Sequence, residues 1–186
     1  LGESLSLHEG LVAESLVYST LQSGPEFGAW LERRPVRRQR EGGRGPVVRV
    51  SRDGARLRLT LNRPEVRNAF SSDMRDALVE ALRVAACDPS VLEVRLDGAG
   101  PAFCSGGDLG EFGSLPDPAT AHAVRSTRHP ARALIACAER VHVRVHGACV
   151  GAGIELPAFA AQVIAREDSW FQLPEVGMGL VPGAGG

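Results

Sequence analysis

The chain contains 186 residues, of which 44% are hydrophobic and 23% charged, and its formal net charge is −1. This is the composition of an ordinary globular domain with a core of its own. The balanced charge argues against nucleic acid or an anionic membrane as the partner. No apolar run approaches the roughly 18 residues of a transmembrane helix. The N-terminus has no charged segment followed by an apolar run, so no signal peptide is expected.

The four cysteines show no zinc-binding pattern. They are Cys87, Cys104, Cys137 and Cys149. No two of them have C-x-x-C spacing, and no histidine lies close enough to complete a ligand set. We therefore expect four reduced thiols, no metal site and a cytoplasmic protein.

The first 46 residues are expected to form a helical extension followed by a basic linker. Apolar residues from Leu5 to Leu31 form a rough helical stripe, which Gly24-Pro25 interrupts. Residues 33–46 are rich in arginine, glycine and proline. Such a stretch could be a phosphate-binding arm, but a solvated linker is its usual meaning, and we favour the linker.

After the linker the pattern changes to strands and helices in alternation. Two alternating stretches, 47–50 and 57–61, flank Arg52-Asp53-Gly54 and predict a β-hairpin. The helix that follows is expected to begin at a serine cap, Ser71 or Ser72. The Asp-Pro pair after this helix should end it, because proline disfavours helical geometry in the residue before it.

The rest of the chain continues this alternation. Strands are expected over 91–96, 141–145, 163–165 and 169–173, one or two helices over 117–139, a Gly/Ala-rich turn over 147–153 and a short apolar helix over 154–161. Alternating strands and helices predict an α/β fold built from βα units. The sequence shows no internal repeat of fixed period.

Three segments place small residues where a strand is expected to give way to a helix. They are residues 104–108, 146–155 and 179–186. Small residues allow a ligand to approach the backbone, and helix N-termini offer free N–H groups. Two such termini aimed at one point would form an oxyanion hole. A single glycine-rich turn is usually only a tight turn, but three of them favour ligand binding.

Two carboxylates lie in apolar surroundings. Glu155 is expected in the first turn of the helix after Gly153, and Glu175 follows Pro174 at the end of a strand. Burying a carboxylate is costly unless it has a partner or a task. A helix-terminal charge and a loop-edge residue are the structural alternatives. As a functional pair, the two could share general acid–base chemistry at one site.

Other chemistries have less support. No G-x-x-x-x-G-K-[ST] phosphate loop is present, and Gly151-Ala152-Gly153 lacks the third glycine of a dinucleotide fingerprint. Ser105 precedes two glycines but does not lie in a G-x-S-x-G nucleophile elbow. His142 and His146 are four residues apart on an expected strand, and that spacing forms no compact metal pair.

Taken in order, four motifs make the chain resemble the enoyl-CoA hydratase/isomerase (crotonase) superfamily. They are LNRPEVRNAFS at 61–71, GAGPAFCSGGDL at 98–109, HGACVGAGIEL at 146–156 and FQLPEVGMGLVPGAGG at 171–186. Their order and spacing are specific for the superfamily but much less so for the reaction. The resemblance covers residues 47–186 and leaves 1–46 as an extension.

The resemblance implies an α/β fold that is a spiral of ββα units, with an acyl-CoA thioester as the substrate. The thioester oxygen would lie in an oxyanion hole formed by the N–H groups of Gly107 and Ala152. Glu155 would activate water, and Glu175 would exchange the proton at the α-carbon. The substrate-binding residues would be Arg67, Ala69, Ser105, Gly106, Asp108 and Leu109, with Asp108 capping or orienting a helix. No cofactor is implied, because CoA is part of the substrate.

The sequence departs from the family pattern in several places. Residues 157–162 replace the usual run after the first glutamate, and Pro157 could shift Glu155. Ala152 replaces a glycine but keeps its N–H. Residues 1–46 faintly resemble the extended N-termini of cofactor-independent dioxygenases of the superfamily. Family members continue past the position of Gly186 into helices that close the site and build a trimer. The resemblance therefore implies a missing C-terminal helical region, and a homotrimer or dimer of trimers for the full-length protein.

The presence of both glutamates favours an enoyl-CoA hydratase. An isomerase or an oxygenase of the same superfamily is the alternative within it. A non-catalytic acyl-CoA-binding or assembly module belongs to a different class. A serine peptidase on the related Clp-type fold would need a Ser–His pair that the sequence does not assign.

Overall fold

The computed structural model describes residues 5–34 and 45–185 of the chain. The first stretch forms two helices, α1 (Leu7–Gln22) and α2 (Pro25–Arg33), and the break between them lies where Gly24-Pro25 predicted it. A capping box begins α1, since the side chains of Ser6 and Glu9 each accept the other's backbone N–H. Most of the predicted basic linker lies outside the described residues.

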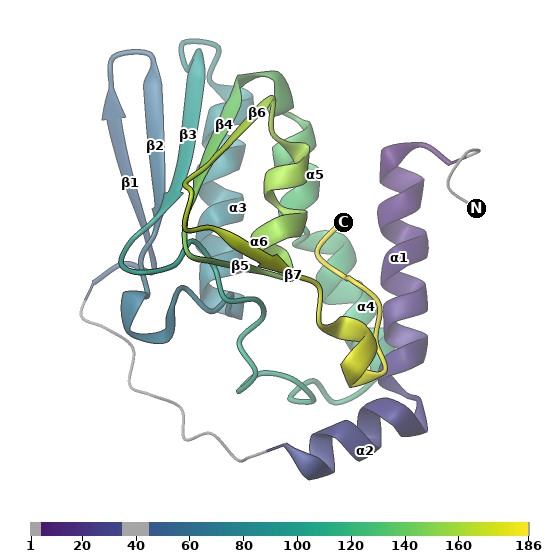
Figure 1. Cartoon of the computed structure of the whole chain (residues 1–186). Helices are drawn as coiled ribbons and strands as arrows, with labels where there is room; N and C mark the ends of the chain where they lie inside the picture. Colours follow the sequence, from purple (N-terminus) through teal and green to yellow (C-terminus); the bar gives the residue numbers. More distant parts are fainter. Residues whose placement is uncertain (1–4, 35–44, 186) are drawn as a thin grey trace.

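The larger of two sheets has the strand order β1-β2-β3-β4-β6 (Figure 1). Its strands are β1 (Val48–Asp53), β2 (Arg56–Leu61), β3 (Glu93–Gly98), β4 (Val141–Val145) and β6 (Gln162–Ala165). The predicted hairpin forms as an antiparallel β1–β2 pair, and all later neighbours are parallel. Parallel neighbours require crossover connections, and these bring the helices onto one face of the sheet.

A second, smaller layer contains the parallel pair β5 (Ala148–Val150) and β7 (Trp170–Gln172). Two isolated parallel bridges, Phe70 with Gly107 and Cys104 with Cys149, extend it. The prediction of a simple turn over 147–153 is therefore wrong. That segment contains β5, whose hydrogen-bonding partner lies some twenty residues further along the chain and leaves no local signal.

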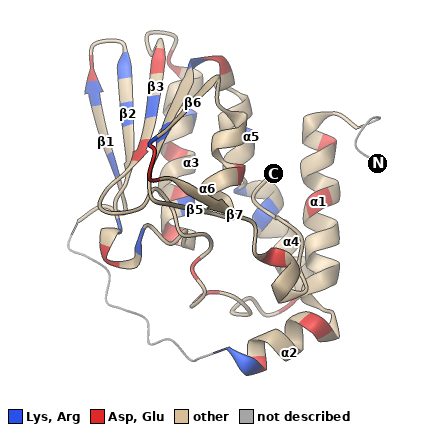
Figure 2. Cartoon of the chain, viewed as in Figure 1, with Lys and Arg blue, Asp and Glu red and all other residues tan. Residues whose placement is uncertain are grey.

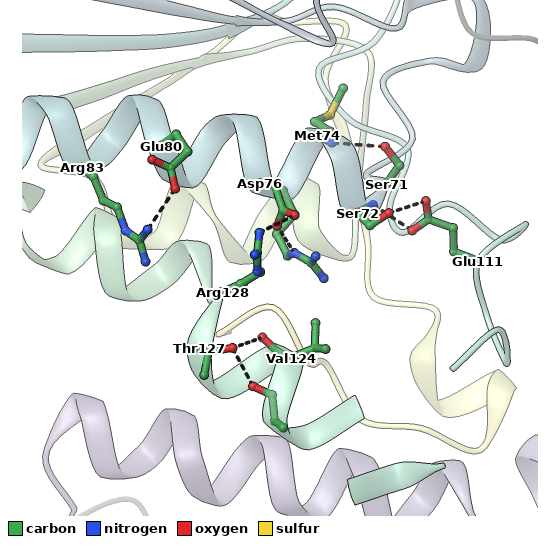
Figure 3. Close-up of polar contacts among 12 residues, drawn as sticks. Ser71, Ser72, Met74, Asp76, Glu80, Arg83, Glu111, Val124, Thr127 and Arg128 are labelled. Carbon is green, nitrogen blue, oxygen red and sulfur yellow. Dashed lines mark hydrogen bonds and ion pairs between the residues drawn. The ribbon is translucent and has the colours of Figure 1, made fainter. Parts of the chain in front are cut away.

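Three longer helices follow the hairpin: α3 (Ser72–Cys87), α4 (Pro118–Thr127) and α5 (Pro130–Ile135). Ser71 caps α3, because its hydroxyl accepts the Met74 N–H at 3.3 Å (Figure 3). The side chain of Arg128, at the end of α4, reaches Asp76 on α3 at 2.8 Å (Figure 3). The apolar face of α3, which includes Met74, Leu78, Leu82 and Ala85, is buried in the core against the sheet.

The short elements differ from prediction around Pro157. The expected helix over 154–161 is instead a single turn, α6 (Ala152–Glu155), followed by the 3₁₀ turn η3 (Pro157–Phe159). Proline has no N–H to continue the i→i−4 pattern, so the chain switches to the i→i−3 bond of Ala160 with Pro157. The remaining 3₁₀ turns are η1 (Pro64–Val66), η2 (Ala138–Arg140) and η4 (Glu175–Met178).

The central strands β2, β3 and β4 alternate between buried and more exposed residues. Leu57 and Leu59 of β2 are buried, while the alternate residues Arg56 and Arg58 face outward and pair with acidic residues of β3. Figure 2 shows charges of both signs spread over these strands. Because these pairs are exposed, they add little stability, and the buried leucines drive the packing.

The N-terminal helices pack against the second half of the core, with α1 beside α4 and α2 beside η4 (Figure 1). All four cysteines are free thiols, as predicted. Within the two described ranges, no helix is long and apolar enough to span a bilayer.

Candidate functional site

The second layer brings two glycine-rich turns into contact. Residues 104–107 lie between the loop at Phe70 and strand β5. The Phe70 N–H donates to Gly106 O at 2.8 Å, and the Cys104 N–H donates to Ala148 O at 3.1 Å. A Cβ placed on Gly151 would lie 3.9 Å from the Gly106 Cα. Two turns more than forty residues apart in the sequence are thus adjacent.

Each turn presents a backbone N–H without a backbone acceptor. Among the described residues, neither the Gly107 nor the Ala152 N–H donates to a backbone oxygen outside the regular elements. Gly107 is only partly buried, whereas Ala152 is buried. The role of these N–H groups in an oxyanion hole stays a prediction.

Two expectations about these turns are wrong. No helix follows residue 108, because the Asp108 carboxylate accepts the Gly110 N–H and closes a tight turn instead. The helix after Gly151 is a single turn, too short for a useful dipole. Any stabilisation of an oxyanion here would come from the individual N–H groups.

Glu155 is almost fully buried, with 3% of its surface exposed, at the end of α6. Its Oε2 accepts the Ala184 N–H at 2.6 Å. The third glycine-rich segment therefore holds the first carboxylate, and the sequence alone did not predict this contact.

Glu175 begins η4 and lies over the second glycine-rich turn. A Cβ on Gly151 would come within 2.6 Å of the Glu175 Oε1, so the Glu175 carboxylate lies directly against this turn. Gly151 has a φ of +49°, which favours glycine. Within the described chain, the Glu175 Oε2 is buried without a hydrogen-bond partner. Burial raises the pKa of this carboxyl.

The predicted CoA-binding residues Arg67 and Ala69 lie on the neighbouring loop, which contacts Ser105 of the first glycine-rich turn. Arg67 and Asn68 both adopt the left-handed conformation, with φ of 54°. The Arg67 carbonyl accepts the Ser105 N–H at 3.0 Å, and the Ser105 hydroxyl donates to Val66 O at 3.3 Å. The Arg67 side chain itself is exposed.

Two residues that the sequence analysis did not assign hold this loop in place. Asn68 is fully buried; its side-chain amide donates to Ala99 O and Ala102 O, each at 2.9 Å. Arg63 donates to the Ala69 carbonyl and to the Asp108 carboxylate, each at 2.8 Å. Both residues lie inside the 61–71 motif, but only the fold shows which groups they join.

The N-terminal helices also reach the site, which the sequence did not predict. The Arg34 guanidinium, just after α2, donates to the Leu109 carbonyl. Phe27 and Trp30 of α2 form an aromatic cluster with Phe112. A Cβ on Gly107 would meet the Phe112 ring at 2.7 Å, so this cluster packs directly behind the Gly107 backbone.

The histidines that raised the question of a metal serve other contacts. His142 Nδ1 lies 3.2 Å from the Gln162 side chain, and His146 Nε2 lies 2.9 Å from Gly100 O. In the part of the chain that the structure describes, no three His, Cys, Asp or Glu side chains are grouped as metal ligands.

A sequence model described as Enoyl-CoA hydratase/isomerase matches residues 53–186. The chain belongs to this family. The match begins inside β1 and includes all four motifs and every residue of the candidate site outside the N-terminal helices.

Curated relatives include hydratases and isomerases. The chain is 39% identical to 2,3-dehydroadipyl-CoA hydratase of Escherichia coli K12, over 74% of this chain and 53% of that protein. It is 28% identical to the peroxisomal Δ(3,5)-Δ(2,4)-dienoyl-CoA isomerase of Arabidopsis thaliana, over 75% of this chain and 54% of that protein. The chain thus spans about half the length of these relatives.

Solved structures of the family share the fold. An enoyl-CoA hydratase/isomerase from Mycobacterium paratuberculosis matches with a TM-score of 0.68 and 31% identity, over 76% of this chain and 58% of that chain. An enoyl-CoA hydratase subunit from Geobacillus kaustophilus matches with a TM-score of 0.67 and 29% identity, over 75% and 53%. These likenesses confirm the predicted α/β crotonase-like fold, and this chain corresponds to part of that fold.

Proposed function

We propose that this chain carries the catalytic part of an enoyl-CoA hydratase, which adds water across a 2-enoyl-CoA double bond. The observation that carries the proposal is the arrangement at the Gly151-Ala152 turn, where the Glu175 carboxylate lies over Gly151 and Glu155 ends the helical turn that begins at Ala152. The unpartnered Glu175 Oε2 supports it, because an unsatisfied buried oxygen is costly unless a ligand or water completes its hydrogen bonding.

In the proposed reaction, Glu155 takes a proton from water as the water oxygen bonds to the β-carbon. The electron pair of the double bond moves into the thioester carbonyl, and the N–H groups of Gly107 and Ala152 stabilise the resulting enolate oxygen. Glu175, protonated at this point, then gives its proton to the α-carbon. Each oxyanion donor would contribute roughly 2.7–4 kcal/mol to the barrier reduction.

The environments of the two carboxylates suit these roles. Burial raises the pKa of Glu175, which favours the protonated acid that the α-carbon needs. Glu155 accepts a backbone N–H from Ala184, which fixes the orientation of the carboxyl group that is proposed to take the proton from water. The reaction needs no cofactor, since CoA enters with the substrate.

The arrangement around Arg67, Ala69, Ser105, Gly106, Asp108 and Leu109 is proposed to bind the CoA portion. Apolar side chains of β6 and β7, including Ile164, Trp170 and Phe171, are exposed and would suit a contact with further protein. We propose, from the family resemblance, that the full-length protein assembles as a homotrimer or a dimer of trimers.

Crotonyl-CoA hydration, followed by loss of the enoyl-thioester absorbance, tests the function. Glu155→Gln and Glu175→Gln should each lower kcat by about 10²- to 10⁴-fold, the usual contribution of a positioned acid or base. The double variant should be little worse than either, because groups acting as a unit are not additive. Glu167→Gln, at an exposed position between β6 and β7, is the matched control and should leave kcat unchanged.

A parallel titration with a non-reactive acyl-CoA thioester separates the alternatives. A hydratase binds the thioester and loses turnover in both glutamine variants. An isomerase turns over a 3-enoyl thioester and depends on one glutamate only. Binding without any turnover would identify a non-catalytic module and overturn the proposed hydration.

A further inference from the structure

Two carboxylates from opposite ends of the chain hold consecutive backbone amides. Glu155 Oε2 accepts the Ala184 N–H at 2.6 Å, and Glu14 Oε1 of α1 accepts the Gly185 N–H at 3.0 Å. Successive Cα atoms lie only about 3.8 Å apart. Glu14 and Glu155 are therefore neighbours at one backbone segment, the Ala184-Gly185 strap. The sequence match to the family begins well after Glu14.

The packing around α1 holds Glu14 firmly at this strap. The Tyr18 ring, one turn further along α1, lies so close to Gly183 that a Cβ there would come within 2.4 Å of it. On the other side, Gly185 fits against Leu11. Three successive contacts thus seat α1 on residues 183–185.

Glu14 faces an imidazole that is held neutral. His129 Nε2 lies 4.0 Å from Glu14 Oε1, and only 3% and 16% of the two side chains are exposed. His129 Nδ1 accepts the Ala131 N–H at 3.2 Å, which assigns the ring proton to Nε2, toward Glu14. Burial, followed by the charges of Arg132 and Arg125, lowers the pKa of His129 to about 4.

The other charged groups around Glu14 come from three elements. Glu155 belongs to α6, Arg125 to α4 and Tyr18 to α1 itself. Burial, and after it the charge of Glu155, raises the pKa of Glu14 to about 7, while the Gly185 N–H and Arg125 oppose the rise. The pKa of Tyr18 is about 12, mainly because of burial, so its phenol stays neutral.

We propose that Glu14 is a positioning residue for Glu155, acting through the Ala184-Gly185 strap, and that the two carboxyl groups together hold one negative charge. This inference rests on the proposed hydratase function. The site then holds one negative charge rather than two before the enolate forms. Ionisation of Glu14 adds a second charge where the transition state becomes anionic, and this opposes the reaction.

A direct titration tests the pairing without any turnover. The protein is labelled with ¹³C at the glutamate carboxyl carbon, and the Glu14 signal is assigned by its absence in Glu14→Gln. We expect Glu14 to titrate near pH 7, and its midpoint to fall in Glu155→Gln, because the charge of Glu155 is one cause of the raised pKa. Glu32→Gln, at an exposed position on α2, is the control and should leave the midpoint unchanged.

The pH profile of crotonyl-CoA hydration tests the consequence. In the unmodified protein kcat/KM should fall several-fold as pH rises through about 7, and in Glu14→Gln the fall should become smaller with KM unchanged, because only the ionisation of the proposed Glu175 acid then remains. The Glu32→Gln control should retain the fall. A fall of the same size and midpoint in Glu14→Gln would overturn the positioning role.

The two proposals fail separately. A Glu14 midpoint near its ordinary value, or one insensitive to Glu155→Gln, overturns the pairing even if hydration is fast. A coupled Glu14 in a protein that never hydrates an enoyl thioester supports the pairing and overturns the hydratase.

Discussion

Arg63 and Asp108 form an ion pair with 2.8 Å between Nη1 and Oδ2, and only 13% and 24% of their side chains are exposed. The same Nη1 donates to the Ala69 carbonyl at 2.8 Å. One guanidinium thus joins the loop at 67–69 to the loop at 105–109. Those two loops carry all the predicted CoA-binding residues, so their relative position depends on Arg63.

Replacing Arg63 with methionine should therefore raise KM for an acyl-CoA thioester by about 10-fold. This corresponds to roughly 1.4 kcal/mol, close to the value of one hydrogen bond to a charged group. The kcat should change less, because the glutamates and Ala152 are on other segments and the backbone on both sides of Gly107 is also held by hydrogen bonds of Gly106 and Asp108 with Phe70. Steady-state kinetics measure both parameters. Arg83→Met is the control, since its pair with Glu80 on α3 is exposed by 56% and 70% (Figure 3). An equal loss of kcat in Arg63→Met would contradict this separation.

Asn68→Ala should lower the free energy of unfolding by about 3 kcal/mol or more. The change leaves the carbonyls of Ala99 and Ala102 and the N–H of Arg63 without their partner, at about 1–3 kcal/mol for each group that stays buried. Alanine also tolerates the φ of +54° less well than asparagine. Urea unfolding measures the loss. Asn62→Ala removes one exposed hydrogen bond, to Pro46, and should cost well under half as much.

Gly107→Ala should destabilise the fold by about 1–3 kcal/mol, the usual cost of overpacking. The new methyl group would meet the Phe112 ring at 2.7 Å, and that ring cannot move freely because Phe27 and Trp30 pack on it. Phe112→Leu in the same chain should recover part of the loss. A double-mutant cycle by chemical denaturation gives the interaction energy directly; strictly additive losses would show that the ring does not limit this position.

Glu14 and His129 should affect the pH dependence of stability in opposite directions. Between pH 4.5 and about 7, Glu14 is protonated in the folded state but ionised in the unfolded state. Glu14 therefore makes the free energy of unfolding fall as pH rises through that window. Between about pH 4 and 6.5, His129 is neutral in the folded state but protonated in the unfolded state. His129 therefore makes the free energy of unfolding rise with pH in that window. The two effects oppose each other between pH 4.5 and 6.5.

Single variants should separate these effects. Glu14→Gln should steepen the rise of stability between pH 4.5 and 6.5 relative to the unmodified protein, whereas His129→Asn should turn it toward a fall. Asparagine keeps an acceptor for the Ala131 N–H, so the cap of α5 is preserved. Thermal or urea unfolding at half-unit steps of pH measures both slopes. Identical slopes in the two variants would be incompatible with these shifted pKa values.

Much of the fold could be predicted because its signals are local. The β1–β2 hairpin follows from the Asp53-Gly54 turn, and α3 follows from the Ser71 cap and its apolar spacing. Strand β5 was missed because three small residues between glycines have no period of their own. It is a strand only because β7 pairs with it.

The candidate site was also only partly predictable from the sequence. Glu155 and Glu175 could be selected from their apolar neighbours and their motifs, and the four motifs indicated the family. The partners that hold them could not be found in this way. The contact of Glu14 with Gly185 spans 171 residues and depends on how α1 packs, which no local pattern encodes.

That long span also bears on how the chain acquires its site during synthesis. At about 5–20 residues per second, a ribosome needs roughly 9–34 s to travel from Glu14 to Gly185. Most of the packing of α1 is with α4 and can form earlier, but the contacts of Glu14 with Gly185 and of Glu155 with Ala184 must await this segment. The backbone strap that holds the two carboxyl groups is therefore completed after both sheets of the described chain.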